Sequence, residues 1–569
     1  MRVTRKQNSS TGAASRPKTA GKARQLANFV LGSVAMLLAG CADLAPGRTD
    51  AADARTPPPA PREFRAAWVA TVANIDWPSK RGLSVAEQKN EIVQIVERAR
   101  ALNLNALIVQ VRPSADAIYP SAYEPWSEYL SGETGKPPQP FYDPLQMWVD
   151  EAHRRGIELH AWFNPYRARH TAARSAPSRD HIANTHPAVV KDYGGYLWMD
   201  PGEPVAAQRT LDVILDVVRR YDIDGVHIDD YFYPYPVTNP PAATPAVPKP
   251  VEVDFPDDAA WSAYLLGGGK LSRADWRRQN VDLLIERIYK GIHAEKSWVK
   301  FGISPFGLGR PDRRPPGIAG FSQYDKLYAD VERWLREGWL DYFVPQLYWP
   351  IEQAAQSYPV LLDYWAKENV RGRHLWPGLF TSRIEKDSTA KSWKTDEIVN
   401  QIRLTRQRAS TDAVLQGHVH FSMVALLDNR QGLNDRLKSL YAMPALSPAM
   451  PWLNDNAPPA PTLRVSRAQP GKRERTLVVQ AGSADAVWQY AVWTRHGERW
   501  NFITLPAIAA SGYDARTGSV RLAEFGIADV AAGAADEINA IVVSAVDRAG
   551  NESRRVRLLL GADGFREEP

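Results

Sequence analysis

Between residues 64 and 442, short hydrophobic runs alternate with longer stretches in which apolar residues recur every three or four positions. The short runs predict buried β-strands, and the longer stretches predict amphipathic α-helices. The predicted strands are 64–71, 106–112, 157–164, 224–231, 300–306, 342–348, 374–380 and 417–422. The predicted helices are 84–102, 143–155, 205–220, 273–293, 325–337, 353–368, 395–409 and 430–441. This strict alternation favours an α/β fold, a closed (β/α)8 TIM barrel rather than an open sheet.

Three of the connections that follow predicted strands are long, namely 113–142, 165–204 and 232–272. Loops at the carboxyl ends of barrel strands build binding and active sites. We therefore expect the functional site at that end of the barrel.

The pattern changes after Trp452, where Pro458-Pro459-Ala460-Pro461 introduces short runs of alternating apolar and polar residues. About 100 residues of this kind predict a small β-sandwich. The stretch 545–553 resembles the last hairpin of a fibronectin type III domain. The proline-rich segment predicts a linker crossed by few contacts.

The amino terminus has the features of an export signal. Basic residues precede an apolar stretch from Leu26 to Gly40 that is too short for a stable membrane span. It ends in Leu38-Ala39-Gly40-Cys41, which resembles the lipobox of bacterial lipoproteins. We expect lipidation of Cys41, the only cysteine in the chain, and a diacyl anchor that holds the protein on a membrane. Ala42, rather than aspartate, after the cysteine favours the outer membrane.

These segments give four predicted parts of the chain. They are a lipoprotein signal peptide over 1–41, a proline-rich tether over 42–62, an α/β barrel over 63–445 and a fibronectin type III-like domain over 456–565.

The basic character of the chain belongs to the export signal. Residues 1–40 contain seven arginines and lysines and no acidic residue, so removing them takes the formal net charge from +6 to about −1. The remainder has no net positive field to attract a phosphate backbone. We therefore expect no nucleic-acid partner.

Strand periodicity assigns polar side chains to the barrel interior. Alternate residues of a barrel strand face the helices and the interior, and we assign the apolar set to the helices. Buried polar groups are costly unless they are satisfied, so many of them near strand ends indicate a polar site. A structural network that ties the strands together is the alternative. The substrate contacts expected on this basis, with Tyr166 from the following loop, are Arg112, His160, Trp162, Asn164, Tyr166, His227, Tyr231, Gln346, Tyr348 and His420.

Gly225-Val226-His227-Ile228-Asp229 resembles the fourth-strand motif of alpha-amylase-like barrel glycosidases. There, an aspartate at the barrel mouth stabilises or attacks the anomeric carbon of an oxocarbenium-like transition state. The resemblance implies that role for Asp229. Asp230 is expected to turn aside into a loop contact, and the opposite assignment of the two remains open.

Glycoside hydrolysis also needs a carboxylic acid that protonates the leaving oxygen. The predicted fifth strand ends in Ser304-Pro305-Phe306-Gly307 and has no glutamate for this role. The candidates are Asp116, Glu128 and Asp230. We prefer Asp116 because it lies just past a predicted strand end, although a carboxylate that only fixes the loop is an equal alternative.

A metal-dependent hydrolase is the main alternative to a glycoside hydrolase. His418-Val419-His420 and His227-Ile228-Asp229 have the spacing of metal ligands. The predicted first strand lacks the paired histidines of amidohydrolase barrels, and no serine lies in a nucleophile elbow. We expect neither a metal nor another cofactor.

Taken together, the motifs resemble the bacterial family called glycosyl-hydrolase-like family 10. The resemblance covers about 64–442, and its motifs occur in order at 65–71, 74–78, 110–119, 160–166, 224–232 and 342–349. It implies a lipid-anchored glycoside hydrolase on the periplasmic side of the outer membrane, acting with the division machinery on peptidoglycan glycan strands stripped of their stem peptides. A glycan-binding barrel without catalysis and a metal-dependent polysaccharide deacetylase remain the alternatives.

Overall fold

The computed structural model describes residues 56–238, 251–387, 389–465, 477–483, 487–507, 513–514, 519–522, 538–561 and 564–568. The predicted signal peptide, Cys41 and most of the predicted tether lie outside the described residues. Within those ranges, no helix is both long enough and apolar enough to cross a membrane.

A curled parallel sheet forms the centre of the fold. Its strands are paired in the order β10-β9-β8-β7-β3-β2-β1-β12-β11. The two end strands, β10 and β11, belong to one segment and are separated only by Trp376 and Pro377, so the same segment contributes to both edges of the curled sheet. The strand bounds are β1 (Phe64–Val69), β2 (Ala106–Arg112), β3 (Glu158–Phe163), β7 (Gly225–Ile228), β8 (Lys300–Ile303), β9 (Tyr342–Phe343), β10 (His374–Leu375), β11 (Gly378–Leu379) and β12 (Gly417–His420).

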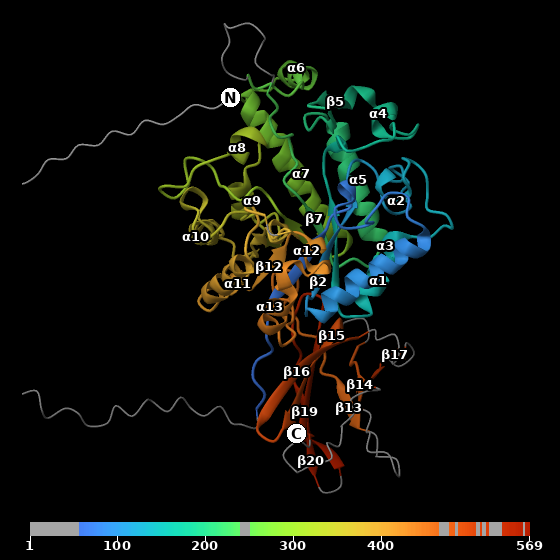
Figure 1. The fold of residues 1–569 in the computed structure, drawn as a ribbon, viewed down its shortest axis with the longest axis vertical. Helices are drawn as coiled ribbons and strands as arrows, with labels where there is room; N and C mark the ends of the chain where they lie inside the picture. The colour runs from blue at the N-terminus through green and yellow to red at the C-terminus, as the bar shows by residue number, and fades with distance from the viewer. Residues whose placement is uncertain are drawn as a thin grey trace, which may run out of the picture. The chain divides into compact units, whose positions relative to one another are not determined.

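Helices surround this sheet (Figure 1). The longer ones are α1 (Val85–Ala101), α3 (Pro144–His153), α5 (Pro204–Arg220), α6 (Asp258–Leu266), α7 (Arg273–Glu295), α9 (Val331–Glu337), α10 (Tyr358–Glu368), α11 (Thr395–Ala409) and α13 (Leu433–Leu440). The short ones are α2 (Glu128–Ser131), α4 (Ile182–Thr185), α8 (Gln323–Lys326) and α12 (Met423–Leu427). The mixed α/β fold predicted from the alternation is therefore confirmed.

Local chemistry explains where elements begin and end. The Ser84 side chain accepts the backbone N–H of Glu87, whose carboxylate accepts the N–H of Ser84, so a capping box starts α1. Proline has no N–H to donate to a ladder. Pro345 and Pro377 therefore shorten the sixth and seventh predicted strands to the two-residue pieces β9, β10 and β11.

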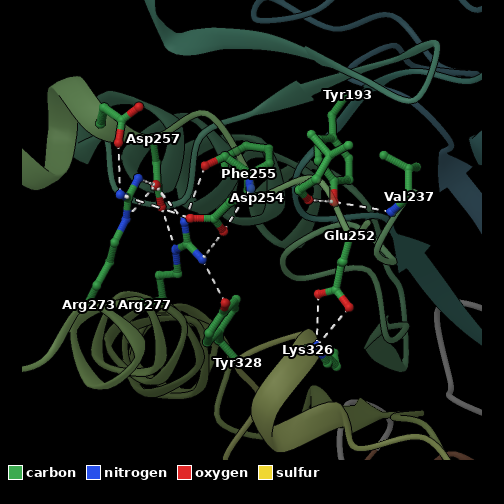
Figure 2. Close-up of polar contacts among 12 residues, drawn as sticks. Tyr193, Val237, Glu252, Asp254, Phe255, Asp257, Arg273, Arg277, Lys326 and Tyr328 are labelled. Carbon is green, nitrogen blue, oxygen red and sulfur yellow. Dashed lines mark hydrogen bonds and ion pairs between the residues drawn. The ribbon is translucent and has the colours of Figure 1, made fainter. Parts of the chain in front are cut away.

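The long connections are more ordered than the sequence predicts. The connection after β3 contains an antiparallel sheet of β4 (Arg167–Arg169), β5 (Val190–Tyr193) and β6 (Tyr196–Met199), in the order β4-β6-β5. The connection after β7 is tied to α7 by Arg277, which donates to Asp257 Oδ2 and Oδ1 at 2.7 Å each and to Asp254 at 2.8 Å (Figure 2). These bonds hold residues 254–257 in place beside the barrel.

The C-terminal residues form two antiparallel sheets. One has the order β13-β14-β18-β17 and the other β16-β15-β19-β20-β21, and apolar residues of both, such as Val479 and Val543, share one core. The arrangement is that of a β-sandwich, whereas its assignment as fibronectin type III stays a prediction. The strand bounds are β13 (Thr462–Val465), β14 (Leu477–Gln480), β15 (Gln489–His496), β16 (Arg499–Pro506), β17 (Tyr513–Asp514), β18 (Ser519–Leu522), β19 (Ile538–Val546), β20 (Val556–Gly561) and β21 (Gly564–Glu568).

The prediction of a linker crossed by few contacts is wrong. Arg548, in the turn after β19, donates to Asp224 at 2.8 Å and to Asp222 at 2.6 Å, just before β7. The Met450 N–H donates to the Ala549 carbonyl at 2.7 Å. Arg62, in the predicted tether, donates to the Gly550 carbonyl at 2.8 Å. Polar pairs of this kind are not visible in the composition of a proline-rich segment.

Candidate active site

The expected side-chain alternation holds on three strands. Leu107 and Val109 of β2, Leu159 and Ala161 of β3, and Val226 and Ile228 of β7 pack in the cluster that includes the helices. Trp162 instead belongs to a separate cluster in the barrel interior with Trp68 and Tyr342. The polar residues of β3 and β7 therefore face the interior.

The alternation predicted for the last strand is wrong by one residue. Val419 belongs to the interior cluster with Phe64, Trp68 and Trp376. His420 faces the other way and contacts the hydroxyls of Thr381 at 2.8 Å and Tyr441 at 3.1 Å. The reason is that this barrel interior is itself aromatic beside β12, so apolar residues pack there rather than against a helix. His420 is therefore not placed to contact a substrate at the barrel mouth.

Asp229 lies at the carboxyl end of β7 and is only 3% exposed. Its Oδ2 accepts the indole N–H of Trp162 at 3.0 Å, and Asn164 Nδ2 lies 3.3 Å from both carboxylate oxygens. Burial raises the pKa of Asp229 to about 7, against the lowering effect of the Arg167 guanidinium and with a further rise from Asp230. A pKa in this range suits a group that both gives and takes a proton near neutral pH.

Asp230 is buried beside it, at 4% exposure. Because β7 ends at Ile228, the chain bends here, and Asp230 accepts the hydroxyl of Tyr235 and a hydrogen bond from Gln346. Burial raises the pKa of Asp230 as well. Asp230 thus makes a contact with the following loop, as the sequence predicted, and it stays buried next to Asp229 at the same strand end.

Arg112 supports this site, and all three nitrogens of its guanidinium group donate hydrogen bonds to other protein groups. Its Nε and Nη2 donate to Glu124 at 2.7 and 2.5 Å, and its Nη1 donates to the carbonyls of Asn164 and Pro165 at 2.5 and 3.1 Å. The predicted substrate contact of Arg112 is therefore replaced by a positioning role. It fixes the backbone that carries Asn164.

His227 and His160 belong to a chain of hydrogen bonds inside the barrel. The indole N–H of Trp68 can only donate, so His227 Nε2, at 3.2 Å, accepts it. Burial lowers the pKa of His227 well below its usual value, so the ring is neutral and its proton is on Nδ1, which donates to the Tyr342 oxygen at 3.1 Å.

The chain continues from Tyr342 to the floor of the barrel. The Tyr342 hydroxyl then donates to His160 Nδ1 at 2.7 Å, and His160 Nε2 donates to Glu158 at 3.1 Å. Gly225 leaves room for this ring, because a Cβ there would lie 2.4 Å from His160 Nδ1. Every ring nitrogen is thus used within the protein, and the predicted substrate contacts of His160 and His227 are corrected to structural ones.

Of the three remaining tyrosines predicted to contact substrate, two lie near the carboxyl pair and one does not. Tyr231 lies under the Arg167 guanidinium at 4.7 Å, and Tyr348 stacks on Phe380 at 4.8 Å. Asp230 and Asp229 both add to the rise in the pKa of Tyr348 caused by burial, so it lies near the carboxyl pair. Tyr166 is fully buried in the helix-side cluster, away from the barrel interior. The expected substrate contact of Tyr166 is therefore wrong.

The structure does not join the other acid candidates to Asp229. Asp116 Oδ1 accepts the Ser114 N–H at 2.8 Å, and the pKa of Asp116 is raised to about 6 by burial. Glu128 accepts the backbone N–H groups of Arg174 and Ser175 at 2.6 to 3.0 Å. Both carboxylates fix loops, which was the alternative to a catalytic role for Asp116.

Arg167 is a site residue that the sequence did not identify. Its backbone N–H donates to Asn164 Oδ1 at 2.9 Å and its Nε to the Pro113 carbonyl at 3.0 Å, while Nη2 is buried without a partner among the described residues. Its position in a long loop beside Asn164-Pro165 was the available signal.

No set of three or more histidine, cysteine or acidic side chains arranged to hold a metal occurs in the part of the chain that the structure describes. The two stretches with ligand-like spacing also face opposite sides of the barrel wall, because His227 points inward and His420 outward.

Comparisons with known proteins identify the family of this chain. The family described as glycosyl hydrolase-like 10 matches residues 63–395. Glycosyl hydrolase YngK of Bacillus subtilis is 45% identical over 412 residues, which cover 71% of this chain and 76% of the relative. Glycosyl hydrolase DigH of Escherichia coli K12 is 34% identical over 361 residues, 59% of this chain and 78% of DigH.

Among solved structures, the PgaB glycoside hydrolase domain of Bordetella bronchiseptica aligns with 67% of this chain and 98% of its own length. The TM-score is 0.42 and the sequence identity 13%.

Proposed function

Since this chain belongs to the glycosyl hydrolase-like 10 family, we propose that it hydrolyses glycosidic bonds of cell-wall glycan, with Asp229 as its central catalytic carboxyl group. The substrate we propose is the peptidoglycan glycan strand stripped of its stem peptides. One observation carries the proposal: the buried Asp229–Asp230 pair lies at the end of β7, and the pKa of Asp229 is about 7.

The surrounding groups support a reaction through a cationic transition state. Trp162 and Asn164 offer Asp229 only N–H donors, so they fix its carboxylate without competing for its proton. The protonated member of the pair would give its proton to the leaving oxygen, and the ionised member would stabilise the positive charge on the sugar. Water then adds to the anomeric carbon and its proton returns to the pair.

We also propose the finer features of fold and location. The curled sheet corresponds to a (β/α)8 barrel, and the C-terminal sandwich to a fibronectin type III-like domain. Lipidated Cys41 would hold the protein on the outer membrane, facing the periplasm and the division proteins that act there.

Incubating the purified protein with peptide-free glycan strands tests the proposed function. We expect new reducing ends, and we expect chelators to leave the rate unchanged. Binding without new reducing ends would favour a non-catalytic glycan-binding barrel. Chelator-sensitive release of acetate would favour a metal-dependent deacetylase.

Replacing Trp162 by phenylalanine is expected to lower kcat and to shift the pH profile. The indole N–H lowers the pKa of Asp229, so its loss raises that pKa further. The limb of the pH profile governed by Asp229 then moves to higher pH. An unchanged profile with a higher KM would instead make Trp162 a residue that only stacks on sugar.

Cys41→Ser is expected to release the protein from the membrane fraction, because thioether lipidation needs the sulfur atom. Fractionation followed by immunoblotting measures this. A variant that stays with the membrane at the wild-type level would contradict the anchor.

A further inference from the structure

A basic cleft lies outside the carboxyl pair. It is lined by Ala73, Asn74, Lys80, Arg81, Ala172 and Arg174 and has a volume of about 410 Å³. This is within the range of about 300–1,000 Å³ typical of small-ligand sites. The Lys80 and Arg174 side chains are exposed at its rim.

Part of the wall of this cleft is rigid. Ala73 and Asn74 both have left-handed backbone angles, with φ of 54° and 57°, and such strained positions cluster at functional sites. Asn74 Nδ2 holds the carbonyls of Pro78 and Tyr129 at 2.8 Å each. Arg81 stacks over the Tyr129 ring at 5.0 Å and donates to the Ala172 carbonyl at 2.6 Å.

The cleft keeps an excess of positive charge. Glu128 lies 3.4 Å from Arg81, but its carboxylate also accepts the backbone N–H groups of Arg174 and Ser175. The negative charge of Glu128 therefore offsets one of the three basic side chains, and two positive charges remain in the cleft. The same positive charge acts on His170, because burial, Arg167 and Arg81 together lower the pKa of His170 to about 4.

Hydrogen bonds connect this positive region to the site of Asp229. The Arg167 N–H donates to Asn164, which contacts Asp229, and Arg81 donates to the carbonyl of Ala172 in the same connection as Arg167. The cleft is built from the connections that follow β1 and β3. These connections leave the same end of the parallel sheet as Asp229.

We infer that the basic cleft binds a free carboxylate on a glycan chain whose bond to be cleaved lies at Asp229. This inference rests on the proposed function and adds its selectivity. A lactyl group in peptide linkage is an uncharged amide, whereas removal of the stem peptide leaves a carboxylate on alternate sugars. The cationic rim of Lys80 and Arg174 favours the second form, and charge complementarity of this kind sets specificity.

The test uses the full-length protein and two substrates, namely peptide-free strands and the same strands with their lactyl carboxylates amidated. The variant is the double substitution Lys80→Gln, Arg174→Gln, which leaves Arg81 and its contacts in place. The control is Arg403→Gln, because Arg403 is an exposed arginine on α11. Initial rates give kcat and KM, and calorimetry gives Kd.

We expect the double variant to raise KM and Kd for the charged strands by roughly fivefold to tenfold with kcat nearly unchanged. The amidated strands should bind the wild type as weakly as the variant, and added salt should remove the difference. Equal affinity of the wild type for both substrates, or equal behaviour of the double variant and Arg403→Gln, would overturn the inference while the proposed function stands. If the wild type cleaves neither substrate, the proposed function fails, and the Kd values alone decide the inference.

Discussion

Replacing Asp229 by asparagine is expected to lower kcat by roughly 100- to 10,000-fold. Asparagine keeps the shape of the side chain but can neither carry a negative charge nor exchange a proton with the substrate. The Trp162 and Asn164 side chains that hold Asp229 remain in place. The KM should therefore change much less than kcat, and initial rates on peptide-free strands measure both.

The same substitution is expected to stabilise the fold. The pKa of Asp229 is about 7 in the folded protein and near 3.8 in a free carboxyl group. Between these values the unfolded chain loses a proton that the folded chain keeps, so wild-type stability falls as pH rises from about 4 to about 7. The asparagine side chain does not titrate, so the Tm gain of Asp229→Asn should be absent at pH 4 and complete above pH 7. Loss of activity through misfolding would lower Tm instead.

Asp230→Asn is the matched control. It removes the other carboxyl group of the pair and should also lower kcat, although less than Asp229→Asn, since the Tyr235 hydroxyl already occupies the Asp230 carboxylate. If Asp229→Asn keeps more than about a tenth of the wild-type kcat while Asp230→Asn is inactive, the two carboxyl groups have the opposite roles.

Deleting residues 452–569 is expected to lower the Tm of the remaining protein by about 10 °C or more. The deletion removes Arg548 from Asp224, which is 2% exposed and also accepts bonds from His153 and the Leu159 N–H at 2.8 Å each. It also uncovers Leu446, which packs with Trp493 and Val542 of the sandwich. Differential scanning calorimetry measures the change.

A single substitution measures the contribution of the Arg548–Asp224 ion pair to stability. Arg548→Met should cost about 3 kcal/mol because it leaves the Asp224 carboxylate buried without that cation. Arg548 helps to hold the pKa of Asp224 well below its usual range, so its contribution is present above about pH 4 and is lost as pH falls. Arg554→Met, at an exposed position nearby, is the control. Equal Tm values for the deletion, Arg548→Met and the wild type would show that the sandwich is independent of the barrel.

The sequence predicted the mixed α/β fold and the position of Asp229 at a strand end for clear physical reasons. On β2, β3 and β7 the helix-facing residues are uniformly apolar, so Leu159, Ala161 and Phe163 leave Trp162 and Asn164 to face inward. The same rule placed Asp229 at the carboxyl end of β7. The glycine two positions before His227 was informative because only glycine accommodates the His160 ring.

Other features depend on tertiary packing that one sequence does not reveal. His420 faces outward because Val419 fills an interior that is already aromatic. Tyr166 and Arg167 are neighbours in the chain, yet the first packs against the helices, whereas the second lies over the Tyr231 ring and lowers the pKa of Asp229. The contact of Gln346 with Asp230 joins residues that are far apart in the sequence, so the strand pattern could not predict it.

Chemical rescue of Asp229→Ala tests the central claim most directly. Removing the carboxyl group leaves a space in which a small carboxylate such as formate can act in its place. We expect the variant to produce almost no reducing ends from peptide-free strands, and we expect added formate to restore cleavage in proportion to its concentration, with no such effect on the wild type. Wild-type turnover of Asp229→Ala without formate, or rescue of Asp230→Ala in its place, would contradict the assignment of Asp229 as the catalytic carboxyl group.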